Sequence, residues 1–189
     1  MPAPTASPLT AFTANLLDVL AEARSAEAAL RQLDLFRRVV AGEGLFSIQQ
    51  NVTTERDPAG EIRLRRFYSS EAERFPVQAP KRKTLTPWTD CLYLQGRVFV
   101  GEGADLLART FDDYEQMRPY GVQSVVNVPL LQGNLCYATF NIFGTRPQWL
   151  PQEILGIRLL ALAAARWVPP APGLAYRFTG ASLTTPVEA

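Results

Sequence analysis

Apolar residues recur at three- and four-residue spacing over the first forty positions of the chain. Phe12, Leu16 and Leu20 mark one predicted helix. A second helix is predicted after Ser25, whose hydroxyl is suited to cap its N-terminus, and Gly42 is expected to end it. This part of the chain should therefore supply two packed helices.

The pattern changes to that of strands after these helices. Residues 45–52 are strand-like, and residues 62–70 alternate Ile62 and Leu64 inward with arginines outward. The turn sequence ERDPAGE between them predicts two adjacent antiparallel strands. Residues 71–86 contain two prolines and a basic run, so we expect a loop there.

The region from Trp88 to Trp149, with the segment that follows it, has a denser succession of short elements. The predicted order is a short helix over 86–95 stopped by a glycine, a strand over 97–101, broken helix and loop over 105–121, a hairpin of strands 124–131 and 135–143, and an apolar helix over 152–167. The domain organisation that follows is a loose arm over 1–10, one domain over 11–168 and a proline-containing tail over 169–189.

The hairpin contains polar residues in strands that are otherwise apolar. A three-residue loop over 132–134 would pair Leu131 with Leu135 and place Asn127 opposite Thr139. Asn127, Thr139, Asn141 and a tyrosine then share one face of the sheet, whereas a two-residue turn would scatter them over both faces. Segregation favours the three-residue loop. Such a polar face suits a small-molecule pocket, although the same amides would also satisfy loop backbone groups lying over the sheet.

Composition excludes several classes of function. With 189 residues and 47% hydrophobic content the chain can bury one domain core. The absence of histidine excludes Ser-His-Asp and Cys-His nucleophilic systems and histidine-ligated metals, so we expect no catalytic residue, no metal and no cofactor. A net charge of +1 gives no general attraction to nucleic acid or to membranes. No secretory signal or spanning segment is evident, so a cytoplasmic location is expected.

The order of elements, together with SVVNVPLL and LCYATFNIF in the hairpin, resembles the GAF domains over about residues 12–168. The resemblance implies an α+β fold: a central antiparallel sheet of five to six strands, with the N- and C-terminal helices on one face and a ligand cavity on the other. Residues 105–121 would form the roof of that cavity. By position, the resemblance assigns to the cavity Asn127, Tyr137, Thr139 and Asn141 on the sheet, Tyr114 and Tyr120 on the roof, and Trp88 and Asp90 from the short helix.

The resemblance also bears on chemistry. The signature of cyclic-nucleotide-binding relatives is not found, and the roof has no cysteine for a covalent tetrapyrrole. Free methionine sulfoxide reductases of this fold use several cysteines around the cavity. This chain has Cys91 near the short helix and Cys136 in the hairpin, expected on its apolar face. Two free thiols are favoured, with one structural bridge between them as the alternative.

The leading hypothesis is therefore a small-molecule-binding sensory or regulatory domain that is not an enzyme. A thiol-dependent reductase and a purely structural dimerisation module, whose cavity would be filled by side chains, are the alternatives. The expected partners are a small-molecule ligand, a second copy bound through the terminal helices, and a separate output protein. The basic residues of 63–66 and 81–83 are read as solvated charge, with an anion-binding patch as the alternative.

Overall fold

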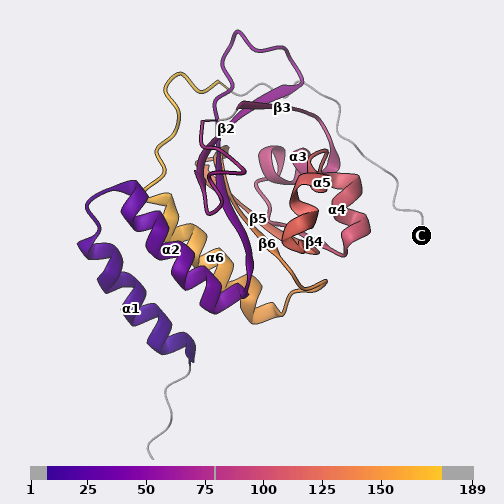
Figure 1. Ribbon diagram of the computed structural model, residues 1–189. Helices are drawn as coiled ribbons and strands as arrows, with labels where there is room; N and C mark the ends of the chain where they lie inside the picture. The colour runs from indigo at the N-terminus through magenta and orange to yellow at the C-terminus, as the bar shows by residue number, and fades with distance from the viewer. Residues whose placement is uncertain (1–7, 79, 176–189) are drawn as a thin grey trace, which may run out of the picture.

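A six-stranded antiparallel sheet in the order β3-β2-β1-β6-β5-β4 forms the centre of the molecule (Figure 1). The computed structural model describes residues 8–78 and 80–175. The strands are β1 Gly44–Asn51, β2 Glu61–Ser69, β3 Pro80–Thr84, β4 Phe99–Glu102, β5 Ser124–Gln132 and β6 Leu135–Gly144. The predicted α+β class is confirmed, as are the pair β1 and β2 and the hairpin of β5 and β6.

Three longer helices lie together on one side of the sheet (Figure 1). They are α1 Pro8–Glu22, α2 Ala26–Ala41 and α6 Pro151–Ala165. The predicted cap of α2 is confirmed, because the Ser25 hydroxyl oxygen accepts a hydrogen bond of 3.1 Å from the backbone N–H of Ala28. Gly42 ends α2 at a φ of 72°, a conformation that favours glycine. No helix in the described part of the chain is both long and apolar enough to cross a membrane.

The start of α1 overlaps the segment predicted as a loose arm. The helix begins at Pro8, so residues 8–10 of that segment are helical, while residues 1–7 lie outside the described part. Proline is tolerated in the first turn of a helix because the N–H that it lacks would have no intrahelical partner there. Of the predicted tail, residues 169–175 lie within the described part and 176–189 outside it.

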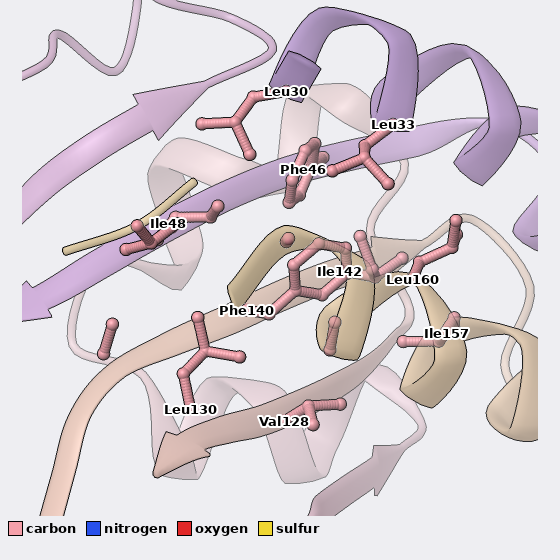
Figure 2. Close-up of a cluster of buried hydrophobic side chains, with 14 of the residues drawn as sticks. Leu30, Leu33, Phe46, Ile48, Val128, Leu130, Phe140, Ile142, Ile157 and Leu160 are labelled. Carbon is pink, nitrogen blue, oxygen red and sulfur yellow. The ribbon is translucent and has the colours of Figure 1, made fainter. Parts of the chain in front are cut away.

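The main core lies between these helices and the sheet. Figure 2 shows side chains of α2, β1, β6 and α6 directed toward one another, among them Leu33, Phe46, Phe140 and Leu160. Helix α6 approaches α2 closely at Gly156, where a Cβ atom would lie only 2.5 Å from Cγ1 of Val40. The helical face of the sheet is thus filled by packing.

Short helical segments cover the opposite face of the sheet. They are α3 Pro87–Thr89, a π-helical turn Asp90–Leu94, α4 Ala104–Thr110, α5 Tyr114–Met117 and a 3₁₀ turn Arg118–Tyr120. Residues 105–121, which we call the roof, are broken helix and loop, as predicted. A second buried cluster joins the roof to the sheet, and includes Leu64, Trp88, Phe111 and Phe143.

Strand β3 corrects the prediction of a loop over 71–86. It pairs with β2 at the edge of the sheet, with Lys81 opposite Leu64 and Lys83 opposite Ile62. The pattern of apolar alternation is missing because this strand is held by backbone pairing and by ion pairs. Pro80 begins it, and its missing N–H is tolerated at the start of an edge strand.

The predicted hairpin register is wrong, although the segregation of its polar residues is confirmed. A two-residue turn pairs Gln132 with Leu135, and a β-bulge then leaves Asn127 directly opposite Asn141. Asn127, Thr139 and Asn141 share the roof side of the sheet. The bulge falls at Tyr137, which therefore packs in the helix-side core instead of beside the amides.

Candidate ligand cavity

A cavity partly open to solvent lies between the sheet and the roof, on the face opposite α2 and α6. Its volume is about 60 Å³. Strands β1, β2, β3, β5 and β6 contribute to its lining, together with Trp88 of α3 and with roof residues. The polar lining includes Ser47, Gln49, Arg66, Asn127 and Asn141. The structure thus contains a pocket where the sequence predicted one.

A chain of side-chain hydrogen bonds forms part of the cavity floor. The Nε1–H of Trp88 donates to Oδ1 of Asn127 at 2.8 Å, and Nδ2 of Asn127 donates to Oδ1 of Asn141 at 2.7 Å. Nδ2 of Asn141 in turn donates to the backbone oxygen of Thr139 at 3.2 Å. Both amides are buried, so this chain satisfies polar groups that would otherwise be costly to bury.

Local sequence fixes the position of Trp88. The Thr86 hydroxyl oxygen accepts from the backbone N–H of Thr89 at 3.2 Å, and Oγ1 of Thr89 accepts from the backbone N–H of Thr86 at 2.7 Å. This reciprocal cap starts α3 at Pro87. The indole then packs edge-on against Phe111 of the roof, with ring centroids 5.7 Å apart. Trp88 therefore joins the floor amides to the roof.

Two ion pairs connect strand β3 to the roof. The ammonium groups of Lys81 and Lys83 bond the carboxylates of Asp113 and Asp112, which follow α4. The hydrogen bond from Lys83 holds the pKa of Asp112 below its usual value. Arg82, between the two lysines, points the other way and bonds Glu61 of β2 at 3.0 Å. The alternation of β3 thus directs its two lysines to the cavity side.

Arg66 of β2 is a buried cation on the cavity wall, with an exposed fraction of 6%. Its Nη1 donates to the backbone oxygen of Pro76 at 3.1 Å, and its guanidinium carbon lies 5.5 Å from the ring centroid of Phe75. Burial lowers the pKa of Arg66, an effect that the charge of Asp113 partly offsets. Within the described ranges no carboxylate comes within 4.0 Å of its nitrogens.

Of the predicted site residues, Asn127, Asn141 and Trp88 line the cavity. Thr139 is on the same face of the sheet but fully buried. The hydroxyl of Tyr137 donates to the backbone oxygen of Ala165 at 3.3 Å, on the far face of the sheet.

The other three predicted residues lie in the roof or on the short helix, outside the cavity lining. The Tyr114 hydroxyl donates to the backbone oxygen of Val122 at 3.0 Å. Tyr120 packs against Phe75, with ring centroids 5.8 Å apart, and Asp90 bonds Gln95. These contacts hold the covering segments together.

Gln49, Arg66 and the two lysines of β3 also line the cavity, although the sequence pattern did not assign them to it. The signal for Arg66 was present, because Ile62 and Leu64 point inward and the two-residue period of the strand directs residue 66 to the same side. Gln49 is directly opposite Arg66 on β1, and its Oε1 is buried without a hydrogen-bond partner in the described part of the protein.

Neither cysteine lines the cavity. Cys91 is half-buried beside the backbone oxygens of Arg97 and Val98, and burial raises the pKa of its thiol. Cys136 is buried in the cluster beneath the roof, which corrects its predicted place on the apolar helical face. The bulge at Tyr137 reverses the alternation at this point. Burial raises the pKa of Cys136 to about 12.

No known protein-family description matches the chain. The curated protein sequences contain no match either.

Solved structures with a similar fold are numerous. The GAF domain of a phosphoenolpyruvate-protein phosphotransferase from Acinetobacter superposes with a TM-score of 0.62 at 12% identity, over 86% of this chain and 93% of that one. The corresponding GAF domain from Coxiella burnetii gives 0.59 at 12% identity, over 85% and 94%.

A third similar structure is the chromophore-binding domain of a bacteriophytochrome from R. palustris. It superposes with a TM-score of 0.57 at 10% identity and covers 87% of this chain. This chain spans 62% of the length of that domain. At such identities the likeness shows the fold alone, and the site must be interpreted from its own residues.

Proposed function

We propose that this chain, which has a GAF-like fold, is a regulatory domain that binds a small molecule between its sheet and its roof. The observation that carries the proposal is the cavity whose floor includes the hydrogen-bonded pair Asn127 and Asn141. Apolar walls with a few fixed polar groups are the usual make-up of small-molecule sites. The solved structures of similar fold include a bacteriophytochrome chromophore-binding domain and GAF domains of phosphotransferases, which supports the same interpretation.

Binding without catalysis is part of the proposal. A thiol-dependent reductase would need a reactive thiol at the cavity, whereas both cysteines lie outside its lining and have raised thiol pKa values. A purely structural module would have its cavity filled by side chains, and the open volume favours a ligand over that alternative. We place the domain in the cytoplasm, with a separate protein receiving its signal.

A homodimer through the helical layer is the second part of the proposal. Leu35 and Val39 of α2 and Leu155, Leu159 and Leu162 of α6 are exposed. These two helices lie side by side on the same face of the sheet (Figure 1). Their exposed apolar side chains are the surface to which we assign the interface. A second copy is the partner we propose for this surface.

The test is ligand retention followed by a metabolite screen. Native mass spectrometry of freshly purified protein should show a retained small molecule, and members of a metabolite library should raise the unfolding temperature. Ser47→Leu fills the cavity and should abolish both effects. Gln132→Leu places the same side chain at the exposed hairpin tip and should keep them. The proposal would be overturned if the purified protein retained no small molecule and no compound in the library raised its unfolding temperature.

A further inference from the structure

Among the cations that line the cavity in the described structure, Arg66 alone has no carboxylate partner. Lys81 and Lys83 are each bonded to an aspartate of the roof. Asp113 acts on Arg66 electrostatically but is itself bonded to Lys81. Arg66 as a whole has an exposed fraction of only 6%, and its Nε has no hydrogen-bond partner in the described structure. A cation in this position is costly to keep unless something binds it.

We infer that the cavity binds a small carboxylic acid, with its carboxylate held by the guanidinium of Arg66. This inference rests on the proposed function and names the class of its ligand. Pro76 accepts from Nη1, which leaves the edge that contains Nε for two parallel N–H···O bonds. Such an edge matches the two oxygens of a carboxylate in geometry and charge.

The balance of charge favours a carboxylate over a phosphate group. One positive charge at the cavity is uncompensated by an ion pair, and it matches the single charge of a carboxylate. A phosphate group carries close to two negative charges near neutral pH. Glu71 also lines the cavity and repels any anion there, a doubly charged phosphate group more strongly than a singly charged carboxylate. The volume of about 60 Å³ suits a ligand of few atoms.

Gln49 specifies a second feature of the ligand. It is paired with Arg66 across β1 and β2, and its Oε1 is a buried acceptor that bonds no donor in the described structure. Arg66 and Gln49 do not bond each other. A molecule with a hydroxyl or ammonium group next to its carboxylate satisfies both side chains at once, because it accepts from Arg66 and donates to Gln49. The ligand is thus a small 2-hydroxy or 2-amino acid.

The test compares L-lactate with L-lactamide, which has the same skeleton and no charge, at constant ionic strength. Lactate should raise the unfolding temperature of the wild-type protein and bind in calorimetry, and lactamide should do neither. Arg66→Gln should weaken lactate binding by at least about tenfold. Arg66→Lys, which keeps the charge and loses the paired edge, should also weaken it. Arg82→Gln removes an exposed arginine of β3 outside the cavity lining and should leave binding unchanged.

Three outcomes would overturn the inference. They are equal effects of lactate and lactamide, tighter binding of inorganic phosphate than of lactate through Arg66, and failure of the folded wild-type protein to bind either lactate or glycine, the smallest 2-amino acid. The ligand comparison needs no variant, so a folding defect in Arg66→Gln does not affect it. In the metabolite screen, a fourth result would refute the inference that the ligand is a carboxylic acid: a neutral metabolite that stabilises the wild type but not Ser47→Leu. That result would leave the proposed function intact.

Discussion

Asn127 lies directly opposite Asn141 across β5 and β6, and its amide bonds both Asn141 and the indole of Trp88. A side chain of the sheet thereby holds one short helix of the cavity lining in place. Because Trp88 also packs on Phe111, the sheet, the short helix and the roof are mechanically connected at this point. A substitution at Asn127 should therefore loosen the packing of all three.

The first prediction concerns the cost of removing this amide. Asn127→Leu leaves the Trp88 N–H and the Asn141 carbonyl oxygen buried without partners, and should lower the free energy of unfolding by about 2 to 4 kcal/mol. The double variant with Asn141→Leu should cost less than the sum of the single changes, because it removes an acceptor along with its donor. Urea unfolding measures these values. Asn134→Leu in the exposed turn is the control and should change stability by less than about 0.5 kcal/mol.

The second prediction concerns the ion pair between Lys83 and Asp112. Asp112→Asn should speed amide hydrogen exchange in residues 105–121 at neutral pH, with little change in β1 and β6, because it frees one tether of the roof. Mass spectrometry measures this exchange. Unchanged exchange in the roof would contradict this prediction, and would show that Lys81 and the aromatic contacts are enough to hold the roof in place.

The same pair should give a defined dependence on pH. The folded pKa of Asp112 is lowered, so the stability it contributes is present above the pKa of the unfolded chain and is lost as pH falls through the folded value. The difference in unfolding free energy between wild type and Asp112→Asn should therefore stay constant down to about pH 4 and shrink below it. Arg118→Gln, which removes a surface pair with Glu115 on the roof, is the control.

The third prediction concerns the two thiols. Iodoacetamide at mildly alkaline pH should modify Cys91 slowly and leave Cys136 untouched in the folded protein, whereas both should react in urea. Mass spectrometry counts the adducts. Rapid labelling of both thiols in the native state would contradict the burial of Cys136.

The burial of Cys136 should also affect stability at alkaline pH. The folded pKa of about 12 for Cys136 exceeds its unfolded value, so the stability it contributes is lost between about pH 9 and 12. The free energy of unfolding of Cys136→Ala should therefore fall less over this pH range than that of the wild type, as measured by urea unfolding.

Most of the fold was predictable because its elements carry their own periodicity. The helix from Ser25 and the strand around Ile62 bury one face against the core, and both were placed correctly. Strand β3 was missed because its signal is pairing and charge: Lys81 and Lys83 reach aspartates about thirty positions away, which no local pattern reveals. Only the tertiary structure brings those partners together.

The candidate site was less predictable for two different reasons. The bulge at Tyr137 depends on how β6 fits between its neighbours, and it moved Tyr137 and Cys136 to opposite faces from those expected. The position of Arg66, by contrast, follows from strand alternation. It was overlooked because three arginines in one strand suggested solvent-facing charge. A charged residue at a strand position whose side chain should point inward therefore indicates a site better than the number of basic residues nearby does.

The last prediction tests the proposed dimer at the helical layer. Val39 and Leu162 have exposed fractions of 77% and 72%, and they lie on the adjacent helices α2 and α6. A glutamate at either position places a charge in the proposed interface, where burial of an unpaired charge is costly. Light scattering coupled to size exclusion should show a dimer for the wild type, and Val39→Glu with Leu162→Glu should shift it to monomer. Leu131→Glu introduces the same charge at a side chain with 44% exposure near the hairpin turn, and should remain dimeric. A wild-type monomer at micromolar concentration would rule out this interface, while leaving the cavity on the opposite face of the sheet open to its own test.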